Sequence, residues 1–115
     1  MPGRDWRFRV EDIISAIEKI FAFTKDADFD AFVANEMAVD AVIRNLEIIG
    51  EAARHIPAEI EAKYPDIGWV EMRAIRNILI HEYFGVDVAI IWHTVQTDLS
   101  PLLPNLRNIL GNESK

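Results

Sequence analysis

Apolar residues recur every three or four positions through most of this chain, and this spacing limits the folds open to it. In the helix that we expect from about Arg9 to Lys25 they are Val10, Ile13, Ile14, Ile17, Ile20, Phe21 and Phe23. Between residues 35 and 56 they are Val39, Val42, Ile43, Leu46, Ile49 and Ala53. Such spacing gathers apolar side chains on one face of an α-helix, and no stretch alternates as a half-buried strand would. The pattern predicts an all-α protein.

Short polar residues and prolines indicate where the helices begin and end. We expect a brief helix over residues 28–33, a helix over 57–63 with Pro57 at its first position, and one from Trp69 that ends at Gly85. Asp87 is a suitable N-cap for the last long helix, which Pro101 and Pro104 should break before a final turn ending at Gly111. Four main helices, short ones and short connections favour an antiparallel up-and-down bundle.

Composition limits the compartment and the kind of partner. At 115 residues, half of them apolar, residues 1–115 suit a single domain, and the lack of cysteine excludes disulfides and thiolate metal sites. Neither a secretory signal nor a membrane-spanning segment is recognisable, so we expect a cytoplasmic protein with no membrane partner. The net charge of -7 argues against bulk electrostatic binding of nucleic acid. Any contact with RNA must therefore be local.

The charge deficit lies in the middle of the chain. Residues 26–71 hold eleven of the nineteen acidic residues but three of the twelve basic ones. A solvated helix face and an electrostatic surface for a basic partner would both produce this pattern.

The segment over residues 76–84, RNILIHEYF, is the most informative part of the sequence. On a helical wheel, the expected core residues are Met72, Ile75, Ile78 and Leu79. The opposite face carries Arg73, Arg76, Asn77, Ile80, His81 and Phe84, which mixes large apolar with polar side chains. Two interpretations remain open: a wider core with paired polar groups, or a self-association surface that contains a polar cleft.

A histidine beside an arginine suits the cleavage of a phosphodiester. His81 can exchange a proton near neutral pH, while Arg76 keeps its charge and offers a planar set of donors to phosphorane oxygens. Asn77 is placed to orient a ribose hydroxyl or a phosphate. This chemistry needs neither a metal nor a cofactor, and His55 and His93 lack a recognisable zinc-ligand spacing.

These residues resemble the R-x-x-x-x-H-x-Y signature of the HepT-like toxins of the HEPN superfamily. Residues 44–52, RNLEIIGEA, resemble a second helix of that family, Val86-Asp87 its V-D pair, and Ile67-Gly68-Trp69 its I-P-W, with glycine replacing proline. The likeness runs from about residue 12 to residue 110.

The resemblance implies a HEPN-like bundle that forms a homodimer with the two motifs facing each other. It implies an endoribonuclease toxin with Arg76 and His81 as catalytic residues and Asn77 as an auxiliary, acting on RNA and leaving a 2′,3′-cyclic phosphate. The partner would be a minimal nucleotidyltransferase antitoxin of a type II- or type VII-like pair, which in some family members transfers AMP to the motif tyrosine, here Tyr83. The alternative is a non-catalytic helical module that binds such a partner and a nucleotide.

Other residues have a functional and a structural interpretation. Arg44 and Arg73 would either contact phosphate or form surface ion pairs. Glu51 would either orient Arg76 or His81 or remain a solvated or ion-paired carboxylate. Gly50 lies inside a long helix, where glycine is costly, and therefore predicts a close approach by another helix. Trp69 and Trp92 are expected in the core.

Overall fold

The computed structural model describes residues 5–81 and 87–113, apart from the side chains of Asn77, Ile78, Ile80 and His81. The helices are α1 (Trp6–Thr24), α2 (Phe29–Ala34), α3 (Glu36–Ala53), α4 (Ala58–Lys63), α5 (Trp69–His81), α6 (Val88–His93), the π-helical turn η2 (Thr94–Asp98) and α7 (Leu102–Glu113). The described residues form no strand. The prediction of an all-α protein is confirmed.

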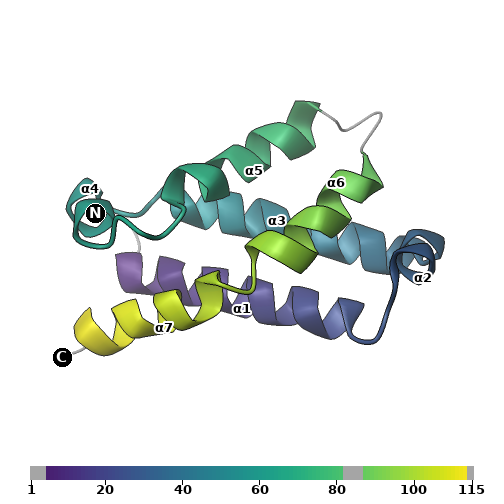
Figure 1. Cartoon of the computed structure of the whole chain (residues 1–115). Coiled ribbons are helices and arrows are strands. Elements are labelled where there is room, and N and C mark those ends of the chain that lie inside the picture. Colours follow the sequence, from purple (N-terminus) through teal and green to yellow (C-terminus); the bar gives the residue numbers. More distant parts are fainter. Residues whose placement is uncertain (1–4, 82–86, 114–115) are drawn as a thin grey trace.

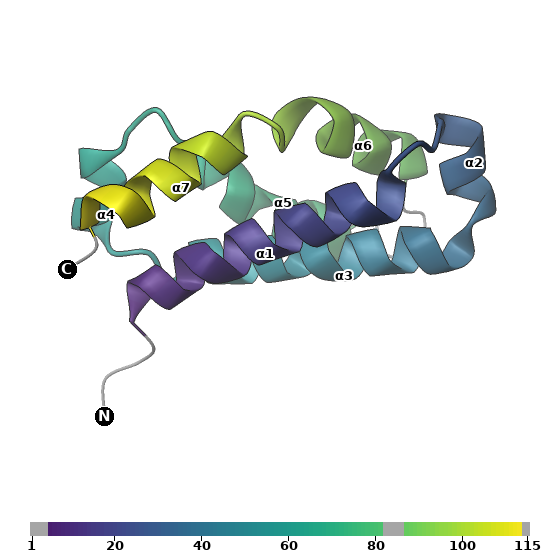
Figure 2. The ribbon, with the colours of Figure 1, turned by 90° about the horizontal axis from the view of Figure 1, so that it is seen from below.

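The helices form an antiparallel up-and-down bundle that measures 44 × 28 × 25 Å (Figure 1). The longest pair, α1 and α3, lies side by side with opposite directions, and α5 packs on α3 (Figures 1 and 2). The last pass, α6 through α7, returns along the bundle and brings α7 against α1. The predicted architecture is therefore confirmed.

The apolar stripes of the sequence build the core. The residues that are no more than 2% exposed include Val10, Ile13, Ile17 and Ile20 of α1, Val42, Leu46 and Ile49 of α3, and Met72 of α5. Trp69 is buried as expected, while Trp92 is partly buried, with its ring centroid 5.0 Å from that of Phe32. In the part of the chain that the structure describes, no helix is both long and apolar enough to cross a membrane.

Short polar side chains cap the helices where the sequence predicts them. The Asp28 carboxylate accepts a hydrogen bond from the Ala31 N–H at 2.8 Å, and the Asp87 carboxylate accepts one from the Ala89 N–H at 2.9 Å. Each bond satisfies an N–H group that the first turn of the helix leaves without an internal partner. Asp5 caps α1 in the same way, so this helix begins at Trp6, ahead of the expected start at Arg9.

The end of the chain differs from the prediction. Instead of a final turn after two prolines, α7 is a helix of 12 residues, and Pro104 lies in its first turn. A proline there breaks no hydrogen bond, because the first N–H groups of a helix have no internal acceptor. Leu106 and Ile109 are fully buried, so this helix completes the core.

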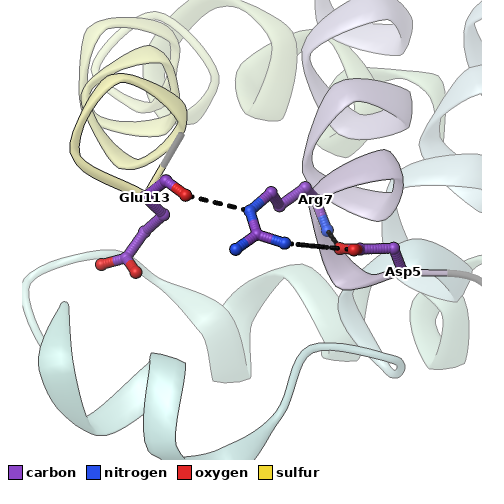
Figure 3. A network of polar contacts seen from close by, with 3 residues as sticks. All are labelled: Asp5, Arg7 and Glu113. Carbon is purple, nitrogen blue, oxygen red and sulfur yellow. Dashed lines mark hydrogen bonds and ion pairs between the residues drawn. The ribbon is translucent and has the colours of Figure 1, made fainter. Parts of the chain in front are cut away.

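Polar contacts tie the end of α7 to α1 and α4. The Arg7 Nε donates to the Glu113 carbonyl oxygen at 3.1 Å, while its Nη1 pairs with Asp5 (Figure 3). The Glu113 carboxylate accepts from Lys63 Nζ at 2.5 Å and from the Tyr64 hydroxyl at 2.7 Å. Three helices are thereby joined at one end of the bundle.

Candidate functional site

A groove of about 330 Å³ lies where α1, α3 and α5 meet. Its lining residues are Arg9 and Asp12 from α1, Arg44, Glu47, Ile48, Glu51 and Ala52 from α3, and Arg76 from α5. The contributions of α3 are three or four residues apart and therefore share one helical face. The groove thus brings Arg76, the first residue of the R-x-x-x-x-H-x-Y motif on α5, together with Arg44 and Glu51 from the family-like segment 44–52 of α3.

Gly50 fixes the position of Arg76. A Cβ built on Gly50 would lie 3.0 Å from the Arg76 Cβ, 3.2 Å from its backbone nitrogen and 3.3 Å from the Met72 carbonyl oxygen. Only a residue without a side chain lets the two backbones approach so closely. The predicted close helix approach is confirmed, and its partner is the backbone turn that carries Arg76.

The face that α5 presents to the bundle differs from the helical-wheel prediction. Met72 and Leu79 are buried as expected, and Ile75 is partly buried and packs against the core. Arg76 was expected opposite the core, yet it lies at the edge of the α3–α5 contact with its side chain 43% exposed. The wheel took the direction of Ile75 as the centre of the core face, whereas the closest approach of the two helices occurs where Gly50 has no side chain.

The carboxylate of Glu51 faces Arg76 across the groove. Its Oε1 lies 3.8 Å from Arg76 Nε and 3.1 Å from Arg54 Nη1, and its Oε2 lies 3.1 Å from His55 Nε2. The hydrogen bond to His55, together with the charge of Arg54, lowers the pKa of the Glu51 carboxyl below its usual value. Glu51 is therefore a carboxylate at neutral pH, in a position to orient the Arg76 guanidinium.

The other two candidate arginines differ in position. Arg44 is exposed on α3 and lines the groove. Arg73 does not line it, because its Nη1 pairs with Glu61 of α4. The structure therefore gathers Arg44, Glu51 and Arg76 but leaves Arg73 outside.

Sequence reasoning missed three charged residues of the groove, Arg9, Asp12 and Glu47, of which Arg9 is the cation. Arg9 lies three residues before Asp12 on α1, so both project from one side of that helix. The sequence did contain a signal for Arg9. Arg9 lies one helical turn before the buried Ile13, which places it at the margin of the apolar stripe of α1. That signal was hidden because the helix was expected to begin at Arg9, whereas α1 begins one turn earlier.

The remaining motif residues are only partly within the described structure. Asn77 and His81 belong to α5, in which they lie four positions apart and so share a face of the helix, but their side chains are outside the described part. Tyr83, Glu82, Phe84 and the expected helix end at Gly85 lie outside the described residues, as does the side chain of Ile80. The two interpretations of the outer face of α5 therefore both remain predictions.

Comparisons with known proteins point to one family. The family model described as ribonuclease HepT-like matches residues 13–109. The chain is 47% identical over 93 residues to "Probable ribonuclease HepT" of Thermococcus cleftensis, which covers 81% of this chain and 84% of that protein. It is 44% identical over 99 residues to "Putative RNase MJ1380" of Methanocaldococcus jannaschii, covering 86% and 91% of the two chains.

A second relative from Methanocaldococcus jannaschii, "Putative RNase MJ0125", is 41% identical over 110 residues, which covers 96% of this chain and 95% of the relative. No solved structure matches. The matched residues include the groove-lining segments of α3 and α5 and the whole of the R-x-x-x-x-H-x-Y motif. The chain therefore belongs to the ribonuclease HepT-like family.

Proposed function

We propose that this protein is an endoribonuclease whose active centre includes Arg76 and His81. The observation that carries the proposal is the position of Arg76: Gly50 holds its backbone against α3, and its guanidinium faces the groove beside Glu51. His81 lies on the same helix, and the relatives named as ribonucleases belong to the same family.

The reaction that suits these residues is attack by a ribose 2′-hydroxyl on the adjacent phosphate. The 2′-oxygen forms a bond to phosphorus, the bond from phosphorus to the 5′-oxygen breaks, and a 2′,3′-cyclic phosphate remains. His81 moves the proton, either from the 2′-hydroxyl or to the leaving 5′-oxygen. Arg76 stabilises the additional negative charge of the phosphorane, and Asn77 positions the substrate. These steps need only the side chains of the chain itself.

A homodimer that joins the two motif faces would complete this centre. Two copies of His81 in one cleft can share the proton transfers, since one accepts a proton while the other donates one. Dimerisation would also double the number of cations near the RNA, which matters in a chain of net charge -7. We expect sedimentation to give about twice the 13.1 kDa of one chain.

The physiological role that fits this activity is that of a toxin neutralised by a nucleotidyltransferase. Transfer of AMP from ATP to the Tyr83 hydroxyl, with release of pyrophosphate, would place an anionic group close to Arg76 and His81 in the sequence, and this group would compete with RNA phosphate for these cations. Intact-mass measurement after co-expression with a minimal nucleotidyltransferase tests this step. The expected result is a gain of one or more AMP groups in the wild type and none in Tyr83→Phe.

The cleavage experiment uses purified protein and RNA in the presence of EDTA. Wild type should produce fragments with 2′,3′-cyclic phosphate ends, and Arg76→Ala and His81→Ala should lose most of the activity. Arg107→Ala is the matched control, since Arg107 is exposed on α7 and pairs with Glu18 outside the groove. Cleavage that survives either motif substitution would rule out the mechanism. Failure to cleave, with stable binding of the nucleotidyltransferase, would favour the non-catalytic module.

A further inference from the structure

The groove contains two arginines that the proposed reaction does not use. Arg9 comes from α1 and Arg44 from α3, whereas the reaction employs only Arg76 from α5. All three side chains line the same groove of about 330 Å³, which is near the lower end of the size range of small-ligand sites. The question is what Arg9 and Arg44 bind.

Arg9 and Arg44 differ from the other described arginines, because neither pairs with a carboxylate of a described residue. Of the seven arginines that the structure describes, five lie no more than 3.8 Å from a carboxylate oxygen; they are Arg7, Arg54, Arg73, Arg76 and Arg107. Arg9 and Arg44 make no ion pair with any described residue. In a chain with 19 acidic and 12 basic residues, carboxylates are plentiful, so these two exceptions in one groove are informative.

Arg9 also carries an unsatisfied donor. Its Nε is shielded from solvent and has no hydrogen-bond partner among the residues that the structure describes. A buried donor without an acceptor destabilises the folded protein, more so when it is charged, so in native proteins such a donor is usually satisfied by a bound water, ion or ligand. The guanidinium fork matches the oxygens of a phosphate, to which it can donate two parallel hydrogen bonds.

The acidic residues of the groove restrict the ligand further. Asp12, Glu47 and Glu51 line it with the three arginines, which gives equal numbers of formal positive and negative charges. A simple polyanion would meet repulsion from these carboxylates as well as attraction. RNA offers phosphates to the arginines and, in addition, ribose hydroxyls and base amino groups that can donate to carboxylates.

We infer that Arg9 and Arg44 bind a phosphate of the RNA strand next to the phosphate that is cleaved. This inference rests on the proposed function, because it takes the phosphate at Arg76 to be the reacting one. Arg9 and Arg44 then hold the strand in register with the motif helix, which makes them substrate-positioning residues of α1 and α3. The groove gives the local cationic contact that the acidic chain needs in order to bind RNA.

The test measures binding in a protein that carries His81→Ala, so that the RNA stays intact. The probe is a fluorescein-labelled single-stranded oligoribonucleotide, and the readouts are Kd by anisotropy and its dependence on salt concentration. Adding Arg44→Ala or Arg9→Gln should each raise Kd about tenfold, which is a loss of about 1.4 kcal/mol of binding free energy. Each should also reduce the salt slope by about 0.7, as expected for one lost phosphate contact on a single strand.

Two further variants make the result specific. Arg9→Lys keeps the charge without the planar fork, so it should restore the salt slope but only part of the affinity. Arg107→Ala removes an exposed, ion-paired arginine outside the groove and should change neither quantity. If Arg9→Gln fails to fold, as judged by circular dichroism, the exposed Arg44 alone decides the result.

The possible outcomes separate this inference from the proposed function. RNA binding that Arg44→Ala and Arg9→Gln weaken supports a phosphate contact by these two arginines, and cleavage by the wild type then places that contact next to the reacting phosphate. Unchanged Kd and salt slope in these variants overturn it, even if the wild type cleaves. Absence of RNA binding by the parent protein also overturns it.

Discussion

The backbone of α5 approaches α3 most closely where Gly50 faces Arg76, and a Cβ on Gly50 would lie 3.0 Å from the Arg76 Cβ. The same contact includes the Arg76 backbone nitrogen at 3.2 Å and the Met72 carbonyl oxygen at 3.3 Å. Two of these three atoms belong to a helix backbone, which cannot turn aside as a flexible side chain would. The position of a motif residue is therefore coupled to a glycine on another helix.

Gly50→Ala should destabilise the protein and impair RNA cleavage more than the loss of folded protein explains. Alanine gains about 1 kcal/mol of helix propensity over glycine, but overpacking of a tight contact costs about 1–3 kcal/mol. We expect a net loss of about 1 kcal/mol, which lowers Tm by about 4 °C in a domain of this size. Displacement of Arg76 by a few tenths of an ångström should reduce kcat/KM about tenfold.

Gly111→Ala is the matched control for this substitution. Gly111 also lies in a helix, α7, but a Cβ there would meet nothing within 4 Å. The variant should be more stable than the wild type by about 0.5–1 kcal/mol, with unchanged cleavage. Similar gains in stability at both glycines, measured by thermal unfolding, would show that the contact at Arg76 does not restrict α5.

Arg73→Ala should leave RNA cleavage unchanged, in contrast to Arg76→Ala. Arg73 pairs with Glu61 of α4 and does not line the groove, so its removal should cost only about 0.5–1 kcal/mol of stability. Glu61→Ala should have a similar effect on Tm, because it breaks the same ion pair. A large decrease in cleavage by folded Arg73→Ala would instead place Arg73 in contact with RNA.

The sequence predicts those features of the fold that depend on local chemistry. Apolar spacing is sufficient for α1, α3 and their shared core, and Asp28 and Asp87 cap helices because a short carboxylate can reach the first free N–H groups. The close approach at Gly50 was also predictable, since glycine is costly inside a helix without such a reason. These features need little knowledge of distant residues.

The features that the sequence does not reveal depend on how helices meet. The face of α5 is set by contact with Gly50, which is 26 positions from Arg76, and the groove joins Arg9 to residues of two other helices. A helical wheel places Arg73 and Arg76 on the same outer face of α5. The structure separates them, because Arg73 forms an ion pair with Glu61 of α4. Tertiary packing therefore decides which of the predicted cations share a site.

Pro104→Ala tests the position of that proline in the first turn of α7. Because the proline there interrupts no internal hydrogen bond, its replacement should change the free energy of unfolding by less than about 1 kcal/mol. Denaturant unfolding measures this change. A proline in a helix interior costs about 3 kcal/mol, so a gain of that size in the alanine variant would contradict the described helix start.

Glu113→Gln should make stability less sensitive to acid. Hydrogen bonds from Lys63 and then Tyr64 lower the pKa of Glu113 below its ordinary value of 4.5. Because the folded pKa is the lower one, this contribution to stability is complete above the unfolded value and is lost as the pH falls through the folded value. The difference in stability between wild type and Glu113→Gln should therefore be largest near neutral pH and should shrink as the pH falls below 4.5 and through the lowered pKa of the folded state.

The Lys63–Glu113 ion pair should also lose its contribution to stability at high pH, where Lys63 deprotonates. The Glu113 carboxylate raises the pKa of Lys63 above 10.5, so the contribution of Lys63 is complete below that value and is lost as the pH rises through the raised one. Glu59→Gln is the control, since Glu59 is exposed on α4 and makes no ion pair with a described residue. Urea unfolding at several pH values should give parallel curves for wild type and Glu59→Gln. Parallel curves for Glu113→Gln as well would show that α7 is not held to α4 through this carboxylate.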